Sequence, residues 1–217
     1  MNVKKRQLKT LYTDGKGVIR GVINAYWTKT ADYPEWKKAV LTIIFKGKGK
    51  ASDPNNHRGV ALQDAIMKLL SAVISKRILT KVVKTEGIEE QFGSQPGRGC
   101  REALFTIRQA LQLRRYHNLP TWVLFVDLVK AFDTANHPLL MALLAKYGAP
   151  EEMVDVIQRL YTDSQLSLKI GKEKQDIPYT VGVKQGDHMA PVLFLFLMQA
   201  MAQTLEAEGL KEGIKIP

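Results

Sequence analysis

The chain has 217 residues, of which 45% are hydrophobic and 24% are charged, a composition typical of a folded globular protein with one domain or two small subdomains. It carries 32 Lys and Arg against 21 Asp and Glu, and the resulting net charge of +11 favours a polyanionic partner, because basic surfaces concentrate phosphate groups. The single cysteine, Cys100, excludes a disulfide scaffold and a cysteine-rich zinc site.

The positive charge is concentrated near the N-terminus. Residues 1–58 hold 13 Lys and Arg and four Asp and Glu, so this quarter of the chain carries nine of the eleven net positive charges. The longest apolar run, 191–202, is too short to span a bilayer, and the N-terminus lacks the apolar core of a signal peptide. We therefore expect an intracellular protein, nuclear or cytoplasmic, without a membrane partner.

The N-terminal third is predicted to contain an extension followed by a hairpin. Residues 1–35 show weak periodicity and are expected to form an extension or a partial element. The continuous apolar and β-branched residues at 39–45 predict a buried strand. A loop rich in glycine and lysine follows, and residues 58–62 are expected to return as a second strand, which makes a hairpin with a positively charged tip.

Helical spacing of apolar residues predicts most of the remaining elements. The expected helices are 63–84, 102–116, 138–147, 150–162 and 190–207. Residues 121–127 are predicted to form a short apolar strand that ends on Asp127, and residues 165–181 are predicted to form a hairpin around Gly171. This order predicts an α+β fold in which helices pack on an antiparallel sheet.

Asp127 is the first candidate for chemistry. A carboxylate at the end of an apolar strand is costly unless a cation or a hydrogen-bond donor pairs with it. One such partner is Mg²⁺, which takes few protein carboxylates and keeps its other positions for phosphate and water. A helix cap or a salt bridge would satisfy the same side chain, so this residue by itself leaves both interpretations open.

Two segments about fifty residues apart give this aspartate a context. Residues 127–133 read Asp-Leu-Val-Lys-Ala-Phe-Asp, and residues 182–191 read Gly-Val-Lys-Gln-Gly-Asp-His-Met-Ala-Pro. Together they resemble motifs A and B of reverse transcriptases, particularly those of non-LTR retrotransposons and their group II intron relatives. Residues 56–62 resemble the fingers motif of that family, and residues 90–99 resemble the segment before its palm. The resemblance covers about residues 36 to 207.

The resemblance implies a fold and an activity. The fold is the right-hand polymerase of the α+β class, with a basic extension at 1–35, fingers at 36–120 and a partial palm at 121–217 that holds motifs A and B. The activity is RNA-directed DNA synthesis, which uses an RNA template, a DNA primer, dNTPs and two divalent metal ions, Mg²⁺ or Mn²⁺. The oligomeric state is left open.

The resemblance also implies roles for residues of motif A and motif B. Asp127 is the expected catalytic metal ligand, and the backbone carbonyl of Leu128 is an expected ligand beside it. Phe132 is expected to exclude a ribose 2′-hydroxyl, although a plain core aromatic would suit the same position. Gln185 is expected to touch the nucleotide or the template base.

Two further groups of residues are expected to contact substrates. The dNTP is expected to lie against the hairpin residues Lys46, Lys48 and Arg58 together with Phe132 and Gln185. The hairpin lysines would equally suit a solvated loop without a ligand. The template and primer are expected to lie along Lys37, Lys38, Arg98, Gly182 and Gly186.

The chain departs from the family pattern in features that bear on activity. Motif C, a Tyr-or-Phe-x-Asp-Asp hairpin, is expected after the final helix, and no two adjacent aspartates occur in the 217 residues. No thumb is expected either, and Gly59 stands where the family usually has proline. Because the site would rest on Asp127 alone, we expect this chain by itself not to polymerise.

Three functions remain open at this point. The chain is part of a reverse transcriptase, or it is a catalytically dead retroelement remnant that acts as a basic RNA- or DNA-binding module. The third is an unrelated basic α+β scaffold that binds a protein, and the intact Phe132 and Gln185 argue against it.

Overall fold

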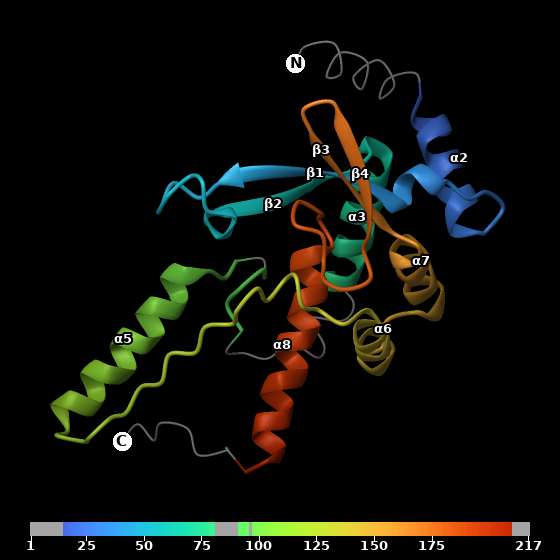
Figure 1. Ribbon diagram of the computed structural model, residues 1–217. Helices are drawn as coiled ribbons and strands as arrows, with labels where there is room; N and C mark the ends of the chain where they lie inside the picture. The colour runs from blue at the N-terminus through green and yellow to red at the C-terminus, as the bar shows by residue number, and fades with distance from the viewer. Residues whose placement is uncertain (1–14, 81–90, 96, 210–217) are drawn as a thin grey trace. The chain divides into compact units, whose positions relative to one another are not determined.

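The computed structural model describes residues 15–80, 91–95 and 97–209 of the chain (Figure 1). These residues form two compact units. Unit 1 comprises residues 15–74, 150–180 and 184–188, and unit 2 comprises residues 75–80, 91–95, 97–149, 181–183 and 189–209. The chain passes between the units more than once, so the motif B segment contributes residues to both. The predicted division into extension, fingers and palm stays a prediction.

A four-stranded sheet forms the centre of unit 1, in the order β2-β1-β3-β4 (Figure 1). Strand β1 (Lys38–Phe45) pairs antiparallel with β2 (His57–Leu62), and β3 (Gln165–Ile170) pairs antiparallel with β4 (Glu173–Pro178). Strands β1 and β3 run parallel, so the sheet is mixed and not antiparallel as expected. Turn signals predict each hairpin locally, but they carry no information on how two distant hairpins meet.

Strand β1 is present where the sequence predicted it, but the expectation that it is buried is wrong. Val40, Ile43 and Ile44 are about half exposed, whereas Ala39 is buried. Strand β3 pairs only with residues 38–41 of β1, so it does not extend along the part of β1 that holds Ile43 and Ile44. The outer half of β1 therefore has β2 as its neighbour in the sheet and carries the loop with the basic tip.

Helix α2 (Lys16–Trp27) lies within residues 1–35, which were expected to form an extension or a partial element. Its ordering comes from Tyr26, which is fully buried and lies 4.9 Å, between ring centroids, from the buried Trp36 of the short helix η1 (Pro34–Lys37). Burial also raises the pKa of Tyr26 to about 12. The spacing of apolar residues does not indicate this helix, because Tyr26 is its one buried side chain.

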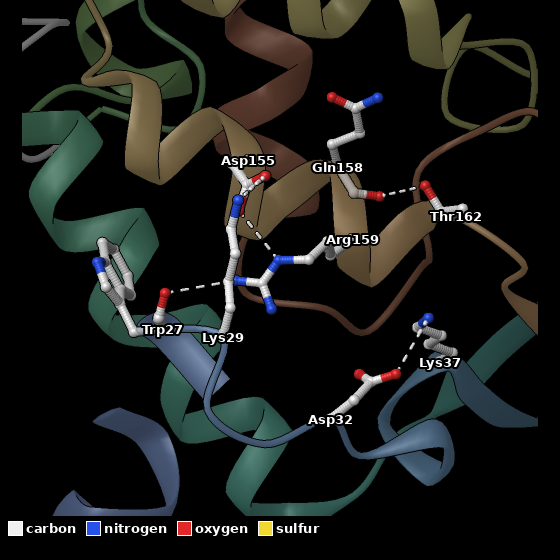
Figure 2. Close-up of polar contacts among 8 residues, drawn as sticks. All are labelled: Trp27, Lys29, Asp32, Lys37, Asp155, Gln158, Arg159 and Thr162. Atoms are coloured by element: carbon white, nitrogen blue, oxygen red, sulfur yellow. Dashed lines mark hydrogen bonds and ion pairs between the residues drawn. The ribbon is translucent and has the colours of Figure 1, made fainter. Parts of the chain in front are cut away.

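Helix α7 (Glu151–Tyr161) holds α2 through an ionic cluster (Figure 2). Asp155 accepts from Arg159 Nε at 3.0 Å and from Lys29 Nζ at 2.9 Å, and the guanidinium of Arg159 lies 4.4 Å from the centroid of the Tyr26 ring. Burial acts to raise the pKa of Asp155, but the hydrogen bonds from Lys29 and Arg159 outweigh it and lower that pKa. The cluster fixes α7 against the end of α2.

The described residues of unit 2 include helices α5 (Cys100–Tyr116), α6 (His137–Lys146) and α8 (Ala190–Ala207). Helix α6 contacts α8, and Leu144 of α6 and Leu193 of α8 are fully buried. Helix α5 has no buried residue among those described. The predicted ranges of α5, α6, α7 and α8 agree with the structure to within two residues. Helix α3 (Ala65–Ile78) also agrees at its start, and the predicted end of that helix lies outside the described residues.

Among the described residues, one helix, α8, is long and apolar enough to cross a membrane, as judged by length and composition alone. The helix continues past the apolar run to residue 207, and the expected absence of a membrane partner stays a prediction. In the structure this helix buries Leu193, Leu195 and Phe196 within unit 2.

Candidate functional site

The segment that leads to Asp127 is irregular, so the strand predicted at 121–127 is wrong. Within the described part of the chain these residues pair with no strand, and Trp122, Leu124 and Phe125 are 94%, 86% and 84% exposed. Apolar composition predicts a strand only where a neighbouring strand supplies hydrogen bonds, and composition carries no information on that neighbour. The start of the segment is held by Arg114, which donates to the carbonyl of Pro120 at 2.6 Å.

Asp127 and Leu128 lie at the exposed end of this segment. Among the described residues, no cluster of three or more His, Cys, Asp or Glu side chains is placed to hold a metal ion. The donors at this position are one carboxylate and one neighbouring backbone carbonyl. Such a set fits a Mg²⁺ ion that substrate phosphates and further carboxylates also hold, because Mg²⁺ often takes only one or two protein carboxylates.

Phe132 follows Asp127 on a turn of unit 2. Its ring is half-buried and stacks on Phe194 of α8, with 5.0 Å between ring centroids and 17° between ring planes. The turn is closed by a hydrogen bond from the Asp133 amide to the Lys130 carbonyl at 2.8 Å. Phe132 is therefore held on one side, by a second aromatic ring.

Backbone hydrogen bonds join this turn to the start of motif B. The amide of Val183 donates to the carbonyl of Phe132, and the amide of Gly182 donates to the carbonyl of Ala135, each at 2.7 Å. Gly182 is buried and has a φ of 94°, a left-handed conformation that favours glycine. The two segments that carry the family resemblance are therefore in direct contact within unit 2.

The next residues of motif B pack against the hairpin of unit 1. The carbonyl of Gln185 accepts from the amide of Ala61 in β2 at 2.8 Å. Gly186 has a φ of 101°, and a Cβ atom there would lie 3.0 Å from the carbonyl oxygen of Ala61. Strand β2 also carries Arg58, three residues earlier. Gly186 thus makes a close backbone contact with β2, and its expected role at the template stays a prediction.

Two charged residues of motif B are buried, which the sequence patterns missed. Asp187 is 4% exposed and accepts from the Ser71 hydroxyl and from Gln63 Nε2, the latter at 3.3 Å. Lys184 is 2% exposed, and its ammonium lies 5.5 Å from the ring centroid of Tyr161. Burial lowers the pKa of Lys184 to about 8, against the opposing effect of the Asp187 carboxylate.

The sequence gives little indication that Lys184 and Asp187 are buried. A Lys and an Asp three residues apart beside two glycines look like an exposed polar loop. The side chains that cover Lys184 come from α7 and from the end of β4, namely Tyr161 and Tyr179. Only the tertiary arrangement brings these rings to the loop.

The predicted basic contacts are mostly exposed. Lys48 and Arg58 are exposed, and Lys46 donates to the Asn55 carbonyl at 2.7 Å, which orders the tip of the hairpin. Lys37 pairs with Asp32 at 3.7 Å (Figure 2). The remaining two predicted contacts, Lys38 and Arg98, are exposed.

Residues 46–214 match the family model described as reverse transcriptase (RNA-dependent DNA polymerase). The chain belongs to this family. One relative is the retrovirus-related Pol polyprotein from type-2 retrotransposable element R2DM of Drosophila melanogaster, which is 28% identical over 83% of this chain and 17% of that protein. The polyprotein from retrotransposable element R2 of Popillia japonica is 25% identical over 88% of this chain and 25% of its own length.

A third relative is the RNA-directed DNA polymerase from mobile element jockey of Drosophila melanogaster, 27% identical over 73% of this chain and 18% of that protein. The resemblance to reverse transcriptases of non-LTR retrotransposons is therefore confirmed, as is the α+β class. The chain spans a quarter or less of the length of these three relatives.

Proposed function

We propose that this chain forms the fingers and part of the palm of an RNA-directed DNA polymerase that copies an RNA template from a DNA primer. The observation that carries the proposal is the contact between motifs A and B, in which Val183 donates to the carbonyl of Phe132 at 2.7 Å. This contact brings the residue expected to test the sugar beside the loop expected to touch the base. The proposed setting is intracellular, nuclear or cytoplasmic.

In this proposal Asp127 holds a divalent metal ion, Mg²⁺ or Mn²⁺, and the Leu128 carbonyl is a ligand beside it. When bound, the metal ions neutralise the triphosphate and lower the pKa of the primer 3′-hydroxyl. Asp127 is exposed, so its carboxylate is accessible to a metal ion that substrate phosphates also hold. Further carboxylates are required from outside this chain's motifs A and B.

The residues proposed to contact the dNTP come from the basic hairpin, from motif A and from motif B. Lys46, Lys48 and Arg58 attract the triphosphate, and Arg58 offers a guanidinium that can bind phosphate bidentately. Phe132, supported from behind by Phe194, blocks the space that a 2′-hydroxyl would need. The support from Phe194 matters, because the Phe132 ring can exclude the 2′-hydroxyl oxygen only if the ring stays in place.

The template and primer are proposed to follow the remaining basic and glycine positions. Lys38 and Arg98 are exposed, Arg98 with its guanidinium 5.8 Å from the ring centroid of Phe92, and Lys37 pairs with Asp32. Gly182 and Gly186 have no side chain, so at these two positions no Cβ atom separates the backbone from a neighbouring group. These contacts do not depend on base sequence and weaken as salt rises.

Primer extension by a chimera tests the proposal. Residues 46–209 of this chain replace the matching segment of the R2DM polyprotein, and the chimera is given an RNA template, a DNA primer, dNTPs and Mg²⁺. We expect template-directed extension that requires the metal ion. A chimera that folds and binds the primer–template but adds no nucleotide would contradict the proposal.

A second candidate function is nucleic-acid binding without synthesis. The net charge of +11 and the exposed basic hairpin favour it, because both act on any polyanion. In that case the chain binds RNA–DNA duplex and single-stranded RNA with similar affinity, and added dNTP leaves both affinities unchanged. Stronger primer–template binding in the presence of the matching dNTP would instead support the polymerase.

A further inference from the structure

His137 connects the helix after motif A to the first turn of motif B. Its Nε2 atom lies 2.7 Å from the carbonyl oxygen of Gly182, across 45 residues of sequence. A carbonyl oxygen only accepts, so Nε2 is the donor in this bond. His137 is the first residue of α6, and the preceding Asn136 caps the helix by accepting from the amide of Leu139 at 2.9 Å.

This bond completes a clamp of three hydrogen bonds on two consecutive residues. Gly182 is bonded through its amide to Ala135 and through its carbonyl to His137, and Val183 is bonded through its amide to Phe132, all at 2.7 Å. The first and third are backbone bonds that any sequence can form. The bond from His137 is the one that depends on a side chain.

The Gly182 carbonyl needs the hydrogen bond from His137 because of its burial and its backbone conformation. Gly182 and Val183 are both buried, and a buried carbonyl without a partner is costly. The left-handed φ of Gly182 places its peptide group in a turn, where no regular ladder supplies a donor. Without the imidazole, the Gly182 carbonyl could reach another hydrogen-bond donor only if the turn moved.

We propose that His137 is a positioning residue that holds the Gly182 turn against Phe132 and thereby maintains discrimination between dNTPs and rNTPs. The inference rests on the proposed function. The ring of Phe132 stacks on Phe194, and its backbone carbonyl accepts from the Val183 amide in this clamp. A turn that shifts at Gly182 carries Val183 with it, and the space for a 2′-hydroxyl opens.

The chemistry of the bond provides a matched set of variants. The neutral Nε2–H tautomer and the imidazolium both donate from Nε2, so the clamp requires a donor and not a charge. The side-chain amide of glutamine places its nitrogen near the position of Nε2, whereas that of asparagine is one bond shorter. His137→Gln should therefore keep the clamp, and His137→Asn and His137→Ala should lose it. His117→Ala changes an exposed histidine of the same unit and is the control.

Amide hydrogen exchange in the full 217-residue chain tests the clamp. We expect the Gly182 and Val183 amides to exchange about tenfold faster or more in His137→Ala and His137→Asn, because local opening becomes easier. His137→Gln and His117→Ala should exchange like the unmodified chain. Unchanged protection in both His137→Ala and His137→Asn overturns the clamp, and so does a His137→Gln variant that exchanges as fast as they do. If His137→Ala does not fold, the comparison of His137→Asn with His137→Gln decides the question.

Nucleotide affinity tests the consequence. The same chains, bound to an RNA–DNA primer–template with Mn²⁺, are titrated with the matching dNTP and rNTP. The ratio of the two Kd values should fall in His137→Asn and recover in His137→Gln, a pattern that general destabilisation does not produce. An unchanged ratio in His137→Asn overturns the selectivity role. A chain that binds neither nucleotide before any substitution contradicts the proposed function and with it the selectivity role, while the exchange rates still decide whether His137 holds the turn.

Discussion

Lys184 shows how a single buried charge can affect the whole chain. The folded protein lowers the pKa of this ammonium to about 8, mainly through burial, while an unfolded chain returns it to about 10.5. Between these values the unfolded state binds the additional proton, so folding becomes more favourable as pH rises from about 8 towards 10.5. Below pH 8 the cost of burying the charge is fully present.

Comparison of Lys184→Met with the unmodified chain isolates this effect. Methionine has a similar length and no charge, and the other titrating groups are shared by both proteins. We expect the difference in the free energy of unfolding between the two to change by about 3 kcal/mol from pH 7 to pH 10.5, in favour of the unmodified chain. Denaturant titrations across this range provide the measurement, and a difference independent of pH would show that Lys184 keeps an ordinary pKa.

Phe132 provides a second prediction for one residue. Phe132→Ala in the chimera should reduce the preference for dNTP over rNTP by roughly tenfold or more, because the exclusion of one hydroxyl depends on an occupied space. Phe105→Ala, which removes a 64% exposed ring of the same unit, is the control. Incorporation of each nucleotide opposite the same template base gives the ratio. Equal ratios in Phe132→Ala and the control would remove Phe132 from sugar selection.

For single residues, the sequence identifies candidate site residues better than it predicts their burial and their hydrogen-bond partners. Asp127, Phe132 and Gln185 were singled out by the resemblance to the family's motifs A and B, and their roles stay predictions. The burial of Lys184 and the reach of His137 to the Gly182 carbonyl were not predicted. Both depend on residues 23 and 45 positions away, which only the folded chain brings together.

The elements differ in how much of their stability is local. Helix α6 begins with Asn136 as its cap and proline in its first turn, both signals written in adjacent residues. Asn136→Ala should lower the free energy of unfolding by about 1 kcal/mol, whereas Asn136→Asp, which retains the capping oxygen, should stay near the unmodified value. Chemical denaturation of the three proteins tests this, and equal losses in Ala and Asp variants would exclude the cap as the cause.

Most helices and both hairpins were therefore predicted, whereas the strand at 121–127 was wrong and the pairing of the two hairpins was not predicted. The four helices α5 to α8 follow from periodicity, caps and glycine or proline stops, all of which act within one element. The segment at 121–127 has the composition of a strand, but within the described residues it pairs with none, and it is exposed. The parallel pairing of β1 with β3 joins segments more than 120 residues apart, beyond the range of any local signal.

At the scale of the whole chain, net charge determines how the protein meets its partners. The hairpin tip is exposed and carries Lys46 and Lys48, so the double variant Lys46→Glu/Lys48→Glu should weaken binding to RNA–DNA duplex. The slope of log affinity against log salt concentration should become less steep by about 2, one for each lost phosphate contact. Filter binding at several salt concentrations measures this slope.

The control places the same charge change on the other hairpin of the sheet. Lys169→Glu/Lys172→Glu reverses two exposed lysines at the β3–β4 turn and leaves the total charge equal to that of the first variant. If both double variants lose the same affinity and slope, net charge alone drives binding and the β1–β2 hairpin has no special place on the nucleic acid.

The most direct measurement of the proposed activity is primer extension by the chimera with one carboxylate changed. Asp127→Asn removes the proposed metal-ligand charge, and Asp163→Asn changes an exposed aspartate in unit 1 as the matched control. Asp127→Asn should abolish extension while primer–template binding stays within about twofold, and Asp163→Asn should extend normally. Extension by Asp127→Asn at the rate of the control would contradict the polymerase site proposed for this chain.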